Sequence, residues 1–325
     1  MKYRKRFGLF LAIFCLSALS ACGRENGKGT PPGGKEGLPK VVTTIFAPYD
    51  FARQVAGDRV ELSMLLKPGM ESHSYEPTPQ DIIKIQNCDV FVYVGGENDV
   101  WVEDILESIE NPTMKTIKLL DCVENRVEEE IVEGMEGKEE TEEAEDGEEA
   151  EWDEHVWTDP MNALRISEKM EAVFEEIDAE NAAFYKKNLE IYKNTLTELD
   201  GKFRELISGK KRDVLIFGDR FPLRYFVEAY GLRYYAAFPG CSGETEASAA
   251  TIAFLTDKVR EEKIPVVFQI ELSNGNIAKS IAETAGVETG IFYSCHNVSQ
   301  EDYDAGVTYV SLMERNLEVL KKALY

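Results

Sequence analysis

"NAAFYKKNLEIYKNTLTELDGKFRELISG", residues 181–209, predicts one long amphipathic helix near the middle of a 325-residue chain. Its large apolar residues recur at alternating intervals of four and three, which places them on one helical face: Tyr185, Leu189, Tyr192, Leu196, Leu199, Phe203 and Leu206. At 1.5 Å per residue such a helix measures roughly 40 Å. It can therefore run along two halves of a molecule. Because a continuous helix is a poor hinge, we expect those halves to move little relative to each other.

Short apolar runs alternate with amphipathic stretches on both sides of this helix. The strand-like runs are residues 41–46, 60–66, 89–94, 213–217, 233–238 and 265–270. The helical stretches between them are residues 48–57, 78–87, 221–230, 246–262 and 276–285. This alternation predicts parallel sheets with helical crossovers. The expected fold class is therefore α/β, with two (β/α) sandwich domains, each built on a mostly parallel sheet and joined by one long rigid helix.

The predicted domain boundaries follow from these patterns. We expect an N-terminal α/β domain at 40–178, a linking helix at 179–209 and a C-terminal α/β domain at 210–325. An acidic insert at 124–154 interrupts the first domain. It contains almost no large apolar residues and is predicted to be disordered, since it cannot bury enough surface to fold alone.

The first residues resemble an export signal. A basic start is followed by an apolar run, Phe7 to Leu19, that is too short to span a membrane comfortably. The run ends in "LSAC", residues 19–22, which resembles a bacterial lipobox and implies lipid attachment at Cys22. The alternative is an ordinary secreted protein with an incidental cysteine. With 1–22 as a lipoprotein signal and 23–39 as a flexible tether, the folded part is expected at the outer face of the cytoplasmic membrane.

The net charge of the chain is −24. Residues 128–154 hold 16 acidic residues and one lysine, a net charge of −15, so most of the excess lies in the insert. No basic stripe offsets these acids, and nucleic acid is therefore excluded as a partner.

The chain has only three histidines. His73 lies in "MESHSYEPTP" (70–79), His155 in "EHVWTDP" (154–160) and His296 in "YSCHNVS" (293–299). Each is expected in a loop at or just beyond a strand end, where open α/β sheets bind ligands. A single histidine is more often a surface or core residue than a ligand. Three in such loops favour a metal site, because imidazole nitrogens suit zinc and similar metals.

Several longer stretches resemble one family. They are "HSYEPTPQDIIKIQNCDVFVYVGGENDVWVEDIL" (73–106), "EHVWTDPMNA" (154–163), "YFVEAYGL" (225–232) and "GVTYVSLMERNLEVL" (306–320). Together they are similar to the cluster A-I metal-binding lipoproteins, the zinc or manganese receptors of ABC transporters. The resemblance implies two α/β domains joined by a backbone helix, a metal ion in the cleft between them, and a membrane permease as partner.

The resemblance also implies a ligand set. His73 and His155 match the first two ligand positions of the family. At the third position this chain has Arg220, which cannot coordinate a metal because guanidinium has no acceptor, so the neighbouring Asp219 is the expected substitute. His296 stands near the fourth position, where the family usually has a carboxylate. The expected metal is Zn²⁺, with Mn²⁺ as the alternative.

Residues around these ligands have expected supporting roles. Glu271 follows strand 265–270 and is predicted either to orient a histidine ring or to serve as an alternative ligand; a simple helix-start charge is the other interpretation. Asp159 and Pro160 are expected to form the turn after His155, and Trp157 to pack inside. Cys241 and Cys295 lie in loops near the expected cleft, where a disulfide is favoured over metal ligation or free thiols.

An enzyme is not expected. The chain has no His-Glu-x-x-His helix and no Gly-x-Ser-x-Gly elbow. Cys295 and His296 are adjacent, so on an extended backbone their side chains diverge and cannot form a thiolate pair. The predicted function is a monomeric extracytoplasmic metal receptor. A surface adhesin on the same fold is the remaining alternative.

Overall fold

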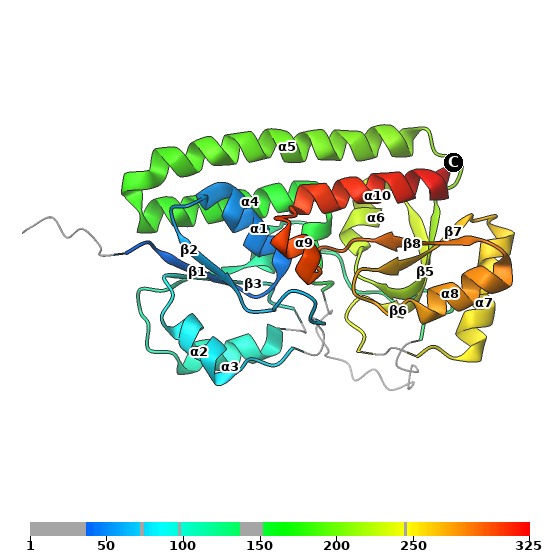
Figure 1. Cartoon of the computed structure of the whole chain (residues 1–325), viewed down its shortest axis with the longest axis horizontal. Helices are drawn as coiled ribbons and strands as arrows, with labels where there is room; N and C mark the ends of the chain where they lie inside the picture. The colour runs from blue at the N-terminus through cyan, green and yellow to red at the C-terminus, as the bar shows by residue number, and fades with distance from the viewer. Residues whose placement is uncertain (1–36, 72–74, 97–98, 137–151, 244–245) are drawn as a thin grey trace, which may run out of the picture. The chain divides into compact units, whose positions relative to one another are not determined.

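The computed structural model describes residues 37–71, 75–96, 99–136, 152–243 and 246–325 (Figure 1). Residues 37–325 form one compact unit. The predicted signal segment, Cys22, most of the tether and His73 lie outside the described residues. Within the described part, no helix combines the length and apolar composition needed to cross a membrane.

Two four-stranded sheets, each with all its strand pairs parallel, confirm the predicted fold class. The N-terminal lobe contains β1 Lys40–Thr43, β2 Glu61–Met64, β3 Val90–Tyr93, β4 Lys115–Lys118, α1 Phe46–Ala56, α2 Pro79–Gln86, α3 Val100–Ser108 and α4 Pro160–Ile177. The C-terminal lobe contains β5 Val214–Phe221, β6 Arg233–Pro239, β7 Val266–Ile270, β8 Glu288–Phe292, α6 Arg224–Tyr230, α7 Ala249–Glu261, α8 Asn276–Ala285, α9 Gln300–Asp304 and α10 Tyr309–Leu324. α5, Ala182–Ser208, joins the lobes.

The two sheets repeat one strand order. It is β2-β1-β3-β4 in the first sheet and β6-β5-β7-β8 in the second. In this order the second strand lies on one side of the first and the third strand on its other side, and ligands bind at the carboxyl ends of the first and third strands, where the strand order switches sides. The carboxyl ends of β1 and β3, and those of β5 and β7, are therefore the places to look for a site.

The strand at Lys115–Lys118 was not expected from the sequence. Its four residues, "KTIK", carry a single large apolar side chain, and the strand lies at the sheet edge. Lysines on an edge strand discourage pairing with another chain, and they also hide the strand from a hydrophobic pattern.

One hydrophobic core runs through both lobes. It includes Val41 and Val90 from the first sheet, Leu215 and Phe268 from the second, and Leu196 of α5. Residues that alternate with these along the strands face outward, under α2 and α3 in one lobe and under α7 and α8 in the other. The predicted boundaries at 178 and 210 therefore separate two sheets that share one core.

α5 runs along both lobes as a single helix of 27 residues (Figure 1). It packs on α1 and α4 in the first lobe and on α10 in the second. The predicted stripe is buried from Tyr185 to Phe203, but its last buried member is Ile207 and not Leu206. The apolar stripe thus attaches both lobes to one straight element, as the spacing predicted.

The predicted disorder of the acidic insert is wrong for its described ends. Residues 127–136 contact the C-terminal lobe, where Val127 donates its backbone N–H to the Tyr225 hydroxyl, and Glu130 pairs with Arg224 at 2.7 Å and accepts a hydrogen bond from Tyr234. The backbone N–H of Glu136 donates to Ala237 O at 2.8 Å, beside β6. This end of the insert is therefore held by ion pairs and backbone hydrogen bonds, since it has too few apolar residues to form a core of its own. Residues 137–151 lie outside the described part.

A buried carboxylate joins α1 to α10. Asp50 is fully buried and accepts the backbone N–H of Tyr309, the first residue of α10, at 2.7 Å. Arg53 donates to Asp50 and, at 2.6 Å, to Val307 O. A carboxylate at a helix N-terminus satisfies backbone donors that have no partner within the helix. Asp50 therefore attaches the last helix of one lobe to the first helix of the other.

We expect Asp50→Ala to lower the free energy of unfolding by about 1–3 kcal/mol, because it leaves the buried backbone N–H of Tyr309 without its acceptor. Asp58→Ala is the matched control. It removes the exposed partner of Arg59 and should cost under about 1 kcal/mol. Urea unfolding of both variants measures the difference. Equal losses in the two variants would contradict this role of Asp50.

Candidate metal centre

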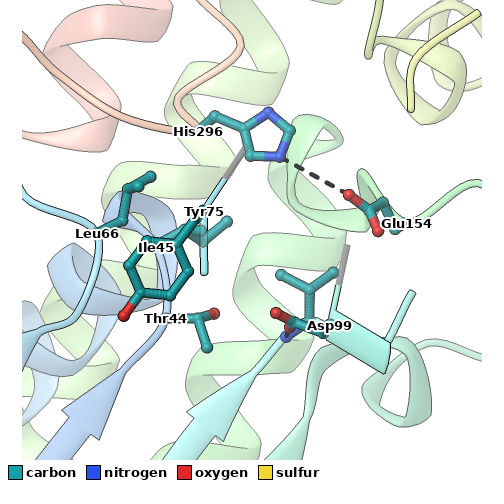
Figure 2. A pocket seen from close by; sticks show the side chains of 8 residues that line it. Thr44, Ile45, Leu66, Tyr75, Asp99, Glu154 and His296 are labelled. Carbon is teal, nitrogen blue, oxygen red and sulfur yellow. Dashed lines mark hydrogen bonds and ion pairs between the residues drawn. The ribbon is translucent and has the colours of Figure 1, made fainter. Parts of the chain in front are cut away.

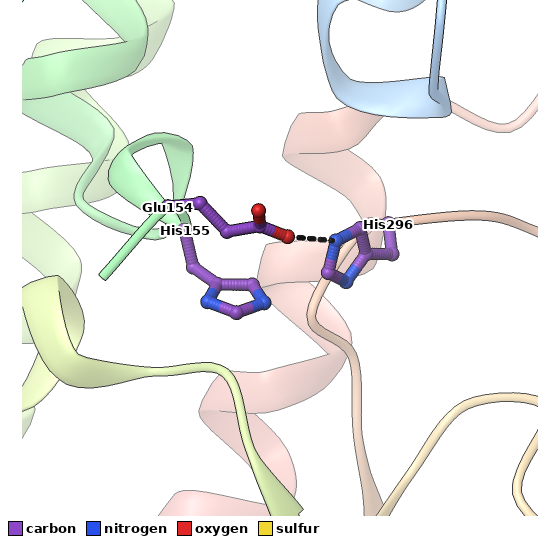
Figure 3. Close-up of side chains that lie close together, drawn as sticks. All are labelled: Glu154, His155 and His296. Carbon is purple, nitrogen blue, oxygen red and sulfur yellow. Dashed lines mark ion pairs between the residues drawn. The ribbon is translucent and has the colours of Figure 1, made fainter. Parts of the chain in front are cut away.

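Three buried side chains meet between the lobes. Glu154 and His155 come from the segment just before α4, and His296 comes from the loop after β8 (Figure 3). Each offers one ligand atom, and these atoms all lie within 4.8 Å of one another. They form the one group of histidine, cysteine or acidic side chains in the described residues that could hold a metal ion. His155 and His296 are thus brought together, as the sequence predicted.

His155 is completely buried, and its ring is held by Asp153. Its Nδ1 lies 3.1 Å from Asp153 Oδ1, which also accepts the His155 backbone N–H at 2.8 Å. A carboxylate at one ring nitrogen favours the tautomer that leaves the other nitrogen available to a metal. Burial alone would lower the pKa of His155, but the charge and hydrogen bond of Asp153, with the charge of Glu154, raise it above the ordinary value.

The surroundings of His155 differ from the prediction in one respect. It was expected at a strand end, but it precedes the 3-10 helix Val156–Thr158, and its nearest chain pairing is an isolated bridge between Glu128 and Trp152. The predicted turn is confirmed. Asp159 caps α4 by accepting the Met161 N–H at 2.9 Å, and Pro160 occupies the first helical position, which needs no donor.

Glu154 is the ligand candidate that the sequence analysis missed. Its side chain is only 1% exposed, and its Oε1 lies 4.0 Å from His296 Nε2. With His296, Thr44, Val94 and Asp99 it lines a cavity of about 20 Å³ at the carboxyl ends of β1 and β3 (Figure 2). Glu154 is the last residue in a run of acidic residues, and the sequence does not distinguish it from the others. Its one distinguishing feature is adjacency to His155.

A second buried carboxylate lies beside Glu154. Asp99 accepts the backbone N–H groups of Val94 and Gly95 at 2.6 and 3.2 Å. Burial, with the charge of Glu154, raises the pKa of Asp99 to about 7. Asp99, Asp153 and Glu154 therefore place three buried carboxyl groups near two imidazoles in the interior. Such a set is stabilised by a bound cation, since buried charges are costly unless they are paired or coordinate a metal.

His296 is held in place from the opposite lobe. Its carbonyl accepts the Phe46 N–H at 2.9 Å. Trp157 is fully buried, as predicted, and its indole N–H donates to Ser294 O at 2.8 Å. The Trp157 ring also packs against the His296 ring, with centroids 4.7 Å apart.

Glu271 orients the backbone of the His296 loop. Its two oxygens accept the N–H and the hydroxyl of Ser294 at 2.7 and 2.8 Å, and it also accepts the backbone N–H of His296. Burial raises the pKa of Glu271 to about 7. The carboxylate therefore holds the main chain of the His296 loop, whereas the sequence predicted that it would orient a histidine ring or ligate the metal.

Asp219 is not part of the three-residue group. Its oxygens accept the backbone N–H groups of Arg220 and Ile270 at 2.9 and 3.2 Å, and it lines a separate cavity with Arg220, Ser273 and Asn274. Burial raises the pKa of Asp219. This geometry favours Glu154, and not Asp219, as the carboxylate of the centre.

The predicted disulfide is absent. Cys295 is a free thiol with no exposed surface, so it is not joined to Cys241. Its backbone has φ +62°, in the left-handed region, which turns the residue into the core. Burial raises the pKa of the Cys295 thiol well above its usual value. Cys295 is not a member of the three-residue group that could hold a metal ion.

His73 lies outside the described residues. The chain is described again from Tyr75, which lines the same cavity as Glu154 and His296. Two imidazoles and one carboxylate are a donor set that suits Zn²⁺, which takes four tetrahedral ligands from nitrogen, oxygen or sulfur. A Zn²⁺ ion held by these three side chains would therefore keep one of its four coordination positions for a further ligand.

The sequence model of the ZnuA family, described as "Zinc-uptake complex component A periplasmic", matches residues 41–323. The chain belongs to this family. It is 31% identical over 326 residues to the "High-affinity zinc uptake system protein ZnuA" of Bacillus subtilis (strain 168), covering 99% of this chain and 98% of that protein. It is 30% identical over 318 residues to "Zinc-binding lipoprotein AdcA" of Streptococcus pneumoniae (strain ATCC BAA-255 / R6). That match covers 98% of this chain but 61% of AdcA, so the chain spans about three fifths of that relative.

Solved structures agree with the fold. The Zn(II)-bound ZnuA-like domain of Streptococcus pneumoniae AdcA is 30% identical with a TM-score of 0.70, and the match covers 89% of this chain and 99% of that one. The laminin-binding protein Lmb of Streptococcus agalactiae has a TM-score of 0.71 at 20% identity, over 88% of this chain and 100% of that one. At this identity the second likeness shows the fold alone.

Gly240 of the C-terminal lobe lies against the His155 ring and leaves no space for a larger side chain at its own position. A Cβ at Gly240 would lie 2.9 Å from His155 Cε1 and 3.2 Å from its Nδ1. We therefore expect Gly240→Ala to displace the ring and weaken metal binding about 10–100-fold, the usual effect of disturbing a residue that orients a ligand. Titration with zinc against a competing chelator measures it.

Gly201→Ala is the control for that variant. Nothing lies within 4 Å of a Cβ at Gly201, in the middle of α5. Alanine there should leave metal affinity unchanged and stabilise the helix by about 0.5–1 kcal/mol. If Gly240→Ala bound zinc like Gly201→Ala, the position of His155 would not matter to the centre.

Proposed function

We propose that this chain is the extracytoplasmic receptor of a metal-uptake ABC transporter and captures Zn²⁺ between its two lobes. The observation that carries the proposal is the buried group of Glu154, His155 and His296, to which both lobes contribute. Membership of the ZnuA family supports zinc as the cargo, since the relatives named above are a zinc uptake protein and a zinc-binding lipoprotein.

The proposed ligands are His73, His155, His296 and Glu154. His73 matches the family motif, and Tyr75, two residues later in the sequence, lines the cavity with Glu154 and His296. Glu154 takes the place that the sequence analysis gave to Asp219. A shell of three imidazoles and one carboxylate favours Zn²⁺, whereas Mn²⁺, the alternative cargo, is better suited by a shell richer in oxygen.

The proposed setting follows from the first residues of the chain. The lipobox resemblance at Cys22 supports a lipid anchor at the outer face of the cytoplasmic membrane. The proposed partner is a membrane permease, which receives the ion from a receptor that acts as a monomer. The shared core and the straight α5 support delivery by small local movements.

Neither alternative class of function gains support. An enzyme that uses zinc keeps one coordination position for water beside a general base, whereas the proposed shell fills four positions with side chains. Adhesion rests on the likeness to Lmb, which concerns the fold alone. The proposed role is therefore binding without catalysis.

The ligand assignment is tested by substituting one group at a time. In metal-free protein we expect His155→Ala and His296→Ala each to weaken zinc binding about a hundredfold or more, since zinc sites of this kind hold roughly 10–16 kcal/mol across their shell. Glu154→Gln, which keeps the shape but removes the charge, should weaken it at least about tenfold. Calorimetry with zinc and with manganese measures the affinities.

Asp219→Asn is the matched control for Glu154→Gln, because each change removes one buried negative charge. We expect its zinc affinity to equal that of the parent protein even if its stability falls. A parent protein that binds neither metal would refute the proposed function. Loss of affinity in Asp219→Asn but not in Glu154→Gln would reverse the assignment of the carboxylate.

A further inference from the structure

The metal centre is closed. Glu154, His155 and His296 are at most 6% exposed, so an ion cannot enter or leave unless part of the chain moves. One described segment beside His296 is residues 67–71, which we call the 67–71 loop. Met70 and Glu71 of this loop, with His296, line a cavity of about 10 Å³. That space holds no more than about one water molecule, so the loop packs closely against the centre.

The 67–71 loop follows β2 of the N-terminal lobe but is attached to the C-terminal lobe. The side-chain amide of Asn297 donates to Lys67 O and to Met70 O, each at 2.8 Å. The Gly69 N–H donates to Val298 O at 2.7 Å. The loop is therefore held by the residues that directly follow His296.

A bidentate ion pair adds a second attachment across the lobes. Arg220, near the end of β5, donates from its two terminal nitrogens to Glu71 Oε1 at 3.2 Å and Oε2 at 3.1 Å. It also donates to Ser242 O at 3.3 Å. Arg220 is only 5% exposed. A paired, desolvated guanidinium holds its partner in a fixed geometry, so the end of the loop is tied to the second sheet.

We propose that Arg220 is a positioning residue that, through Glu71, holds the 67–71 loop over the centre and slows metal exchange. The inference rests on the proposed function, because it requires an ion to exchange. Arg220 does not touch that ion, since guanidinium has no acceptor atom. Neither Glu71 nor Arg220 belongs to the three-residue group, so breaking their pair lowers the barrier to opening for entry and for exit alike. Both rates should therefore rise together, while the equilibrium affinity changes little.

The test measures zinc capture and release by stopped flow, with a chromophoric chelator as the probe. We expect Glu71→Gln and Arg220→Gln each to speed capture and release about tenfold, with the dissociation constant within about threefold of the parent. The double variant should be no faster than either single variant, because all three break the same pair. Glu71→Gln is the milder change, since it keeps Arg220 and its contact with Ser242.

Arg233→Gln is the matched control. Arg233, at the start of β6, forms a bidentate pair with Asp213 at 3.2 and 2.8 Å, at the amino ends of the strands, whereas Arg220 lies near the carboxyl end of β5. It should exchange zinc at the parent rates. Parent-like rates in Glu71→Gln and Arg220→Gln, even with lower melting temperatures, would make the pair purely structural and overturn the inference. So would equal acceleration in Arg233→Gln. A parent that takes up no zinc would instead refute the proposed function itself.

Discussion

The position of His296 depends on hydrogen bonds from the lobe to which it does not belong. Its carbonyl is held by Phe46 at the start of α1, and the carbonyl of Ser294 is held by the indole of Trp157. Glu271 holds the same loop from within its own lobe through Ser294. These bonds bring an imidazole of the C-terminal lobe to within 4.0 Å of the carboxylate of Glu154. Without these hydrogen bonds, His296 would not be held close to Glu154 and His155 of the other lobe.

Other contacts between the lobes keep the ligands of the two lobes in fixed positions relative to each other. α5 packs on helices of both lobes, one apolar core continues through the two sheets, and Asp50 joins α1 to α10. An interior packed in this way resists gradual deformation. Movement that admits an ion therefore belongs to loops over the centre, where attachment depends on a few polar contacts such as that between Arg220 and Glu71.

The sequence predicted the elements with strong periodicity and missed those formed by polar contacts. The long helix and α8 were predicted because apolar spacing carries their signal. β4 was missed because its lysines mask it. The ends of the acidic insert are folded because Glu130 and Glu136 find partners on the C-terminal lobe, which composition cannot reveal. The same reason hid Glu154, since only the tertiary structure distinguishes this buried glutamate from the acids that precede it in the sequence. The Cys241–Cys295 prediction failed because a left-handed backbone turns Cys295 into the core.

The proposed function depends on one metal ion that binds between the lobes at Glu154, His155 and His296. The most direct measurement is anomalous diffraction at the zinc absorption edge from crystals of the protein grown with zinc. We expect a single strong peak within bonding distance of these three side chains. A peak at Asp219, or one that touches only one lobe, would contradict it.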